Sequence, residues 1–255
     1  MNTFYDAVIH HAVNDALMGA PERKLRPEIW VSDLGRNPYG LVRRLITGEL
    51  EPFDYPTRLK MDNGTAMELA TLNQVAQRLN RPVQTQFPLY NEVWSGYADL
   101  VIGHGSQDVT IYDHKASAGR WWDYKGSLPR ASDMLQVWKY GELYKETYGI
   151  QPTLGLYYRG WGTWGEFSVS VIEDTRTGLA MIAQGYITDE KGEEINTVTR
   201  TRQVNPEWLS TSLEAYYNLY LAGDLSIEEM EALNPNGPDW DYAEEATLRL
   251  AEVNA

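Results

Sequence analysis

The stretch GYADLVIGHGSQDVTIYDHKAS, residues 96–117, reads as two apolar strands joined by a turn, and each strand carries an aspartate. If residues 104–108 form the turn, Asp99 lies directly opposite Asp113, and strand alternation puts Lys115 on the face of Asp113. Two carboxylates this close repel each other unless a cation lies between them. The hairpin therefore predicts either a divalent-cation site or an exposed face on which one aspartate pairs with Lys115.

A cation at this hairpin would compensate both carboxylates, whose burial as unpaired charges costs several kcal/mol each. Lys115 would then orient a water molecule or help to deprotonate it, or stabilise charge on a phosphate.

Helix and strand patterns surround the hairpin. Apolar spacing predicts a helix over 65–80, and a second one over 132–149 is expected to be capped by Ser132 and closed by Gly149. Two further helices are expected near 3–18 and 205–222, and residues 31–48 show a Ser/Asp cap signal followed by a short helix. Strands are expected at about 83–90, 93–102, 109–116, 153–158 and 166–172. This order indicates an α/β fold with a central mixed β-sheet flanked by helices, in a single domain over residues 1–255.

The composition is typical of an intracellular globular protein. The chain of 255 residues is 43% hydrophobic, has no run of 18 apolar residues and begins without the pattern of a signal peptide, so we expect a cytoplasmic location. Cysteine is absent, which excludes thiolate zinc sites and a cysteine-ligated iron–sulfur cluster. With four histidines, a metal site is expected to use oxygen ligands, which favours Mg²⁺ or Mn²⁺.

The net charge of −14 argues against a nucleic-acid partner only until its distribution is considered. Residues 224–255 hold nine acidic residues against Arg249 alone, so the acidity is largely a property of this tail. The tail could occupy a DNA groove as a phosphate mimic, but we favour a role in keeping the protein soluble.

Four short motifs occur in an order that resembles the PD-(D/E)XK nuclease superfamily. The similarity is greatest to its RecB-like branch, which includes CRISPR-adaptation nucleases and phage exonucleases of the lambda type. The family pattern is Gly-x-x-x-His/Glu on a helix, Gly-x-x-Asp and Asp/Glu-x-Lys on two strands, and Gln-x-x-x-Tyr on a helix. These motifs fall on Gly64 to Glu68, Gly96 to Asp99, Asp113 to Lys115, and Gln136 to Tyr140.

The resemblance covers about residues 30–172, which would form a restriction-endonuclease-like core followed by a helical extension and the acidic tail. Each motif alone has an ordinary explanation. Thr65-x-x-Glu68 is a helix capping box, and Gln136 with Tyr140 is a polar stripe one helical turn apart.

The resemblance implies a metal-dependent DNA nuclease, more readily an exonuclease than an endonuclease, in recombination, repair or phage DNA processing. Asp99 and Asp113 would bind Mg²⁺ or Mn²⁺, and Glu68 would be a further direct or water-mediated ligand. The backbone carbonyl of His114 would complete the set, while its side chain points to the opposite face of the strand.

The same resemblance implies that Lys115 positions the attacking water, with Gln136 and Tyr140 supporting Lys115 or contacting the DNA backbone. One departure concerns the N-terminal motif SDLGRNPY, residues 32–39. It has Asn37 where iron–sulfur members of the branch carry a cysteine, so no cluster is expected.

Cations and aromatic residues mark candidate DNA contacts. The segment GRWWDYKGSLPR, residues 119–130, interleaves them as single-strand-binding surfaces do, although such a loop could equally be a hydrophobic lid. The candidates are Arg36, Arg43, Arg44, Arg120, Trp121, Trp122, Lys125 and Arg130. The expected partners are single- or double-stranded DNA, recombination proteins and further copies of the chain in a homo-oligomer.

Two other functions stay open. A catalytically silent relative would bind DNA or regulate another protein, although the intact Asp99, Asp113 and Lys115 argue against it. A carbohydrate-active protein would use the aromatic loops and paired carboxylates for sugar stacking and acid–base hydrolysis. Metal dependence separates these classes, because two-carboxylate glycoside cleavage needs no divalent ion.

Overall fold

The computed structural model describes residues 28–49, 66, 68, 70–79, 81–116, 128–160, 163–189, 191–233 and 242–253. The helix expected near 3–18 and the candidate DNA contacts Arg120, Trp121, Trp122 and Lys125 lie outside these ranges. Within them, no helix combines the length and the apolar character needed to cross a membrane.

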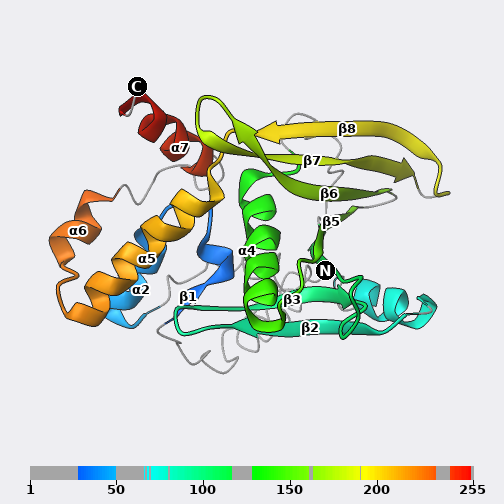
Figure 1. Ribbon diagram of the computed structural model, residues 1–255, viewed down its shortest axis with the longest axis horizontal. Helices are drawn as coiled ribbons and strands as arrows, with labels where there is room; N and C mark the ends of the chain where they lie inside the picture. The colour runs from blue at the N-terminus through cyan, green and yellow to red at the C-terminus, as the bar shows by residue number, and fades with distance from the viewer. Residues whose placement is uncertain are drawn as a thin grey trace, which may run out of the picture.

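A mixed β-sheet of eight strands runs through the molecule, and helix α4 lies across one of its faces (Figure 1). The strands are β1 (Ile29–Trp30), β2 (Val83–Tyr90), β3 (Trp94–Ile102), β4 (Thr110–Ala116), β5 (Thr153–Gly160), β6 (Thr163–Asp174), β7 (Gly178–Asp189) and β8 (Glu194–Arg202). Their order is β1-β3-β4-β5-β6-β7-β8, with β2 paired to β3. The β1–β3 and β4–β5 pairs are parallel and the other pairs are antiparallel.

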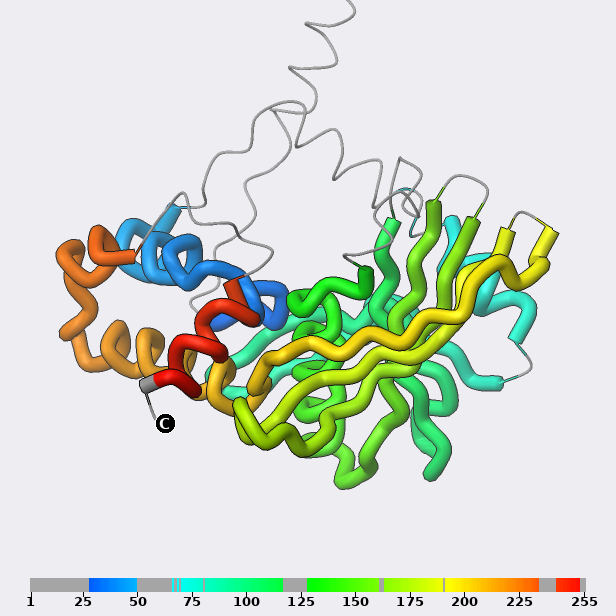
Figure 2. The backbone as a smooth tube through the Cα atoms, turned by 90° about the horizontal axis from the view of Figure 1, so that it is seen from above, coloured from blue at the N-terminus to red at the C-terminus, as the bar shows by residue number. Residues whose placement is uncertain are grey.

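Helices flank the sheet, as the sequence predicts for this α/β class. They are η1 (Val31–Asp33), α2 (Tyr39–Thr47), α4 (Ala131–Tyr148), α5 (Pro206–Ala222), α6 (Ile227–Ala232) and α7 (Tyr242–Val253), and the described residues between 66 and 78 are also helical. Seen from above, α2, α5 and α6 gather at one end of the molecule and the long strands at the other (Figure 2). Helix α4 connects β4 to β5, because parallel neighbours need a crossover.

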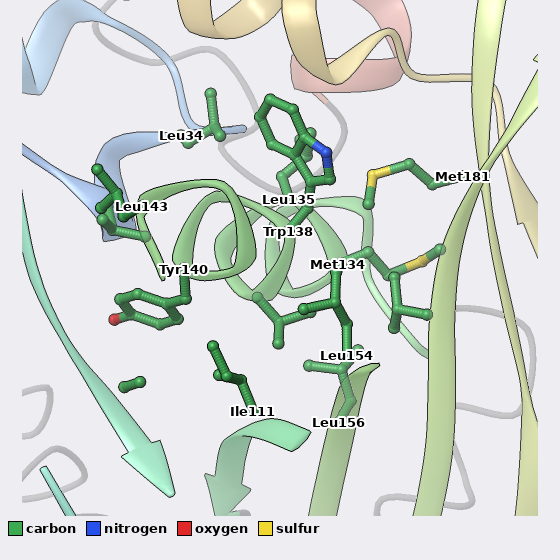
Figure 3. Packing of buried hydrophobic residues seen from close by; sticks show 14 of the residues in the cluster. Leu34, Ile111, Met134, Leu135, Trp138, Tyr140, Leu143, Leu154, Leu156 and Met181 are labelled. Atoms are coloured by element: carbon green, nitrogen blue, oxygen red, sulfur yellow. The ribbon is translucent and has the colours of Figure 1, made fainter. Parts of the chain in front are cut away.

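Helix α4 is the centre of the hydrophobic core. Ile111, Leu154 and Leu156 of the sheet lie on one side of it and Leu34 lies on the other (Figure 3). Because α4 contacts both the sheet and η1, it is buried around most of its circumference and has no continuous polar face. This position fixes the side chains of α4 rigidly against β4.

The elements nearest the hairpin match the predictions closely. Strands β2, β3 and β4 and helix α5 begin and end within one residue of their expected bounds. Helix α4 ends at Gly149, whose φ of 71° is the left-handed conformation that glycine adopts readily. The expected cap by Ser132 is wrong, because the helix begins earlier: Arg130 is the N-cap, and Ser132 already lies in the first turn.

The segment 31–48, expected as a cap followed by a short helix, forms η1 and then α2, with Pro38 at the N-cap of α2. Asp33 connects the two parts. Its carboxylate accepts a hydrogen bond from the Trp30 backbone at 2.8 Å and pairs with Arg44 at 2.7 Å. Packing and an ion pair thus hold this segment without a metal cluster.

Strands β7 and β8 were not predicted, and they carry the sheet past residue 172, where the expected core ends. Strand β8 is an edge strand with most side chains exposed, so it lacks the alternation of apolar and polar residues that marks a half-buried strand.

The acidic C-terminal segment is partly packed against this sheet extension. Ala243 and Thr247 of α7 are buried, and Glu244 pairs with Arg202 at 3.2 Å and accepts from the Gln203 backbone. Part of the acidity therefore stabilises the docking of α7, in addition to any contribution to solubility.

Gly96 generates a prediction about packing. A Cβ atom there would lie 2.8 Å from Tyr140 Cε1 and 2.9 Å from Val31 Cγ2, so Gly96→Ala overpacks the core. We expect Gly96→Ala to lower the free energy of unfolding by about 1–3 kcal/mol, measured by urea denaturation. Gly40→Ala is the control, because that position in α2 has open space around it, and it should cause no loss. Equal stability of both variants would contradict the close approach of Tyr140.

Candidate active site

The β3–β4 register brings Asp99 and Asp113 together as predicted. In this register Leu100 pairs with Tyr112 and Ile102 pairs with Thr110. The next pair along the two strands is therefore Asp99 opposite Asp113. Both side chains are buried, Asp113 almost completely. Asp99 Oδ2 accepts a hydrogen bond of 2.6 Å from the backbone N–H of His114, which fixes its carboxylate against β4.

Lys115 is held among carboxylates and an amide. Its Nζ lies 2.7 Å from Asp113 Oδ2, donates to Gln136 Oε1 at 2.9 Å and lies 3.9 Å from Asp133 Oδ1. Burial alone would lower the pKa of Lys115, but the charges of Asp113, Asp133 and Asp99 outweigh it and raise the pKa above its ordinary value. Lys115 therefore stays a cation. As a hydrogen-bond donor it can orient a water molecule or a phosphate oxygen.

Helix α4 supplies the support for Lys115. Gln136 Nε2 donates to the Tyr140 hydroxyl at 3.1 Å, one helical turn further along. Tyr140 is buried against Gly96, and burial together with the nearby Asp113 raises the pKa of its hydroxyl beyond the ordinary range. Of the two roles expected for Gln136 and Tyr140, the geometry favours positioning Lys115 over contacting DNA.

Asp133 and Tyr158 belong to the same cluster and were not predicted. The Tyr158 hydroxyl donates to Asp133 Oδ2 at 2.6 Å, and both residues are buried. Asp133 precedes Gln136 by three residues on α4, so helical spacing could have placed both on one face. Nothing in the sequence around Tyr158 of β5 indicates that it lies beside Asp133 and Gln136.

Glu68 reaches the site through Gln86, a further residue that sequence patterns missed. The amide Nε2 of Gln86 donates to Glu68 Oε1 at 2.6 Å and to Asp99 Oδ1 at 3.1 Å. The helix that carries Glu68 is tied to β5 by a hydrogen bond from Arg159 to Thr71. Gly64 and Thr65, the start of the expected motif and capping box, lie outside the described residues.

The side chain of His114 lies on the opposite face of β4, as expected. Its ring stacks on Tyr157 with 5.7 Å between centroids and 24° between planes. Burial, and then the neighbouring Arg159 and Lys115, lower the pKa of His114 to about 4, so the ring is neutral near pH 7. A neutral, packed imidazole fits a structural role for this side chain.

The site holds more negative charge than its own cation offsets. Among the described residues, Lys115 is the cation that pairs with Asp113 and approaches Asp133, while Glu68 and Asp99 lie within hydrogen-bonding reach of each other and both accept from the neutral Gln86 amide. Burial, followed by repulsion from Glu68, raises the pKa of Asp99 to about 6. Burial likewise raises the pKa values of Asp113 and Glu68.

Buried carboxylate oxygens in excess are the donor set that a hard divalent cation requires, so the residue types fit Mg²⁺ or Mn²⁺. In the described part of the chain, however, no three Asp, Glu or His side chains stand close enough to form a ready ligand group. Glu68 and Asp99 lie within hydrogen-bonding reach of each other, and both accept from the Gln86 amide.

The candidate DNA-contact arginines differ in their surroundings. The prediction that Arg44 contacts DNA is wrong. Arg44 is buried, paired with Asp33 and stacked at 3.9 Å over the Trp30 ring, so it stabilises the fold. Arg43 lies 3.9 Å from Glu49, and Arg36 is exposed beside a cavity of about 140 Å³. Arg130 is exposed at the N-cap of α4, the helix that carries Gln136 and Tyr140.

The larger hollow in the described structure lies elsewhere. A groove of about 430 Å³ crosses the other face of the sheet from α4, and the hydroxyls of Tyr112 and Tyr186 on its wall both donate to Glu166. The two hydroxyls satisfy Glu166, and Glu194, a second carboxylate in the lining of the groove, is exposed to water. The hairpin, and not this groove, is therefore the chemically distinctive place in the molecule.

Comparison with known proteins adds little to this geometry. No family model and no curated protein match the chain. Among solved structures, the crystal structure of SSO0001 aligns with a TM-score of 0.39 and 16% identity over 66% of this chain and 77% of the other. A TM-score this low does not establish a shared fold.

The raised pKa of Asp99 generates a prediction about pH. Its folded-state pKa of about 6 exceeds the ordinary 3.8, so between these values the folded protein binds more protons than the unfolded chain and stability falls as pH rises. In chelator, wild type should lose on the order of 1 kcal/mol more than Asp99→Asn between about pH 4 and about pH 6, measured by urea denaturation. Parallel pH profiles for the two proteins would show that Asp99 is not destabilised by its surroundings.

Proposed function

We propose that this chain is a Mg²⁺- or Mn²⁺-dependent deoxyribonuclease that hydrolyses phosphodiester bonds. The observation that carries the proposal is the buried meeting of Asp99, Asp113 and Lys115 on adjacent strands, with Lys115 held by Gln136. It agrees with the resemblance of the sequence motifs to PD-(D/E)XK nucleases, and the mixed sheet with α4 across one face is compatible with that class.

Asp99 and Asp113 would hold the divalent ion, with Glu68 as a further direct or water-mediated ligand and the His114 carbonyl as a neutral one. When bound, the ion supplies positive charge that offsets the carboxylates and stabilises negative charge on the phosphate. The excess of carboxylates over cations at this place supports the assignment. No iron–sulfur cluster is part of the proposal, because the chain has no cysteine.

The protein's own residues would supply orientation and fixed charge. The Lys115 ammonium donates hydrogen bonds and stays protonated, so it would align the attacking water or stabilise a non-bridging phosphate oxygen as charge develops. Gln136 takes one of its protons at 2.9 Å and is in turn fixed by Tyr140. Such preorganisation reduces the rearrangement needed to reach the transition state.

The substrate we propose is DNA, single- or double-stranded, cleaved more readily from an end than internally. Exposed Arg36 and Arg130, the partly exposed Arg43, and the aromatic and basic residues of 119–127 are the candidate contacts to the strand. A role in DNA recombination, repair or phage DNA processing follows from the same resemblance. So do recombination-protein partners and a homo-oligomer, whereas the proposed cytoplasmic location rests on the composition of the chain.

Digestion of end-labelled DNA tests the proposal. Linear duplex and single-stranded DNA, labelled separately at the 5′ and 3′ ends, are incubated with Mg²⁺ or Mn²⁺ and with chelator. We expect cleavage by wild type that stops in chelator and falls about 100–1,000-fold in Lys115→Ala, because a fixed charge at the transition state is lost. The label released first gives the polarity.

Two controls make this test decisive. Lys145→Ala removes an exposed lysine from the last turn of α4, the helix that supports Lys115, and should leave the rate unchanged. Thermal melts report whether each variant folds. Absence of cleavage by wild type on linear and circular DNA would instead indicate a silent binding protein. Carbohydrate cleavage that persists in chelator would indicate a glycosidase.

A further inference from the structure

Gln86 has an unusual backbone conformation directly opposite Asp99. In the β2–β3 ladder Thr85 pairs with Leu100 and Phe87 pairs with Ala98, so Gln86 faces Asp99. The ladder is interrupted at this step, because Gln86 has a φ of 51°. Among the described residues it is the one non-glycine with positive φ. Such a conformation is disfavoured for a side chain as long as glutamine and persists only where the surroundings hold it.

The side-chain amide is what holds Gln86 in place. Its Nε2 atom donates to Glu68 Oε1 at 2.6 Å and to Asp99 Oδ1 at 3.1 Å, so a single NH₂ group joins carboxylates from a helix and from a strand. Asp99 is buried and Glu68 partly so, and the amide adds one donor to each carboxylate, for Asp99 in addition to the His114 N–H. The turned backbone thus aims the amide between two acidic groups.

This amide nitrogen competes with a cation for the same two carboxylate oxygens. The Nε2 atom lies 2.6 Å from Glu68 Oε1 and 3.1 Å from Asp99 Oδ1, so its N–H donors use the lone pairs that an ion would need. An ion held by both carboxylates would therefore require the NH₂ group to turn away from them.

We propose that Gln86 is an exchangeable ligand of the metal site, an inference that rests on the metal-dependent function proposed above. Without an ion, its NH₂ group holds Glu68 and Asp99 together. With an ion, the side chain turns so that Oε1 faces the metal. The terminal amide torsion is soft enough for this exchange. A carbonyl oxygen is a ligand that Mg²⁺ and Mn²⁺ accept, and it adds no charge to a site already rich in carboxylates.

Calorimetric titration with Mn²⁺ tests this role without an activity assay. Gln86→Met keeps the length of the side chain and removes both the donor and the oxygen, so we expect Mn²⁺ affinity to fall about 10–100-fold. Gln84→Met is the matched control, because Gln84 is an exposed glutamine two residues earlier on β2, and its affinity should equal that of wild type. Unchanged or tighter binding by Gln86→Met would overturn the ligand role, since the amide would then only obstruct the ion.

A second variant and a spectrum guard against misfolding. Gln86→Glu places a charged oxygen at the same distance and should tighten Mn²⁺ binding, whereas equal or weaker binding in the folded variant contradicts the proposal. In ¹H–¹⁵N spectra, the side-chain NH₂ signals of Gln86, identified by their absence in Gln86→Met, should move on saturation with Mg²⁺. Signals that stay fixed would also overturn it.

The outcomes separate this inference from the proposed nuclease. If wild type binds no Mn²⁺, the metal-dependent function and the role of Gln86 fail together. If wild type binds Mn²⁺ and cleaves DNA while Gln86→Met binds equally well, only the role of Gln86 fails.

Discussion

The structure around the hairpin is organised by one constraint: an antiparallel register that opposes two buried carboxylates, Asp99 and Asp113. Charges without water or partners cost several kcal/mol, so every neighbouring polar group has a compensating task. The His114 backbone donates to Asp99, Lys115 pairs with Asp113, and the Gln86 amide joins Asp99 to Glu68. Burial disfavours the charged form of both aspartates, so the chain keeps them here at the expense of stability.

Helix α4 fixes the position of the groups that support Lys115. Because this helix is packed between the sheet and η1, its side chains have little freedom, and Gln136 meets Lys115 at a fixed distance. Gly96 contributes by leaving room for the Tyr140 ring against β3. The glycine of the Gly-x-x-Asp motif is therefore explained by close packing, and not by a turn.

Local patterns predicted what depends on local periodicity. Alternation in residues 96–117 was enough to predict the strands and the pairing of Asp99 with Asp113, and helical spacing was enough for Gln136 and Tyr140. Contacts between distant segments were not predictable in this way.

Sequence patterns failed in three ways: they missed residues of the site, they missed a strand, and they misassigned an arginine. Gln86 and Tyr158 reach the site only through the sheet topology, which the sequence pattern leaves open. Strand β8 has too little buried surface to show a strand pattern. Arg44 resembles a surface cation, but Asp33 and Trp30 enclose it in the fold.

The parallel crossover from β4 through α4 to β5 has a consequence for how the protein folds. The β3–β4 hairpin needs only local contacts. Gln136 of α4, which binds Lys115, and Tyr158 of β5, which binds Asp133, reach the hairpin only after a longer loop has closed. The hairpin can therefore form early, but it acquires its polar support only when α4 docks. A partly folded chain carries the acidic pair without the α4 groups that hold Lys115, so assembly of the candidate site and completion of the core arrive in the same late step.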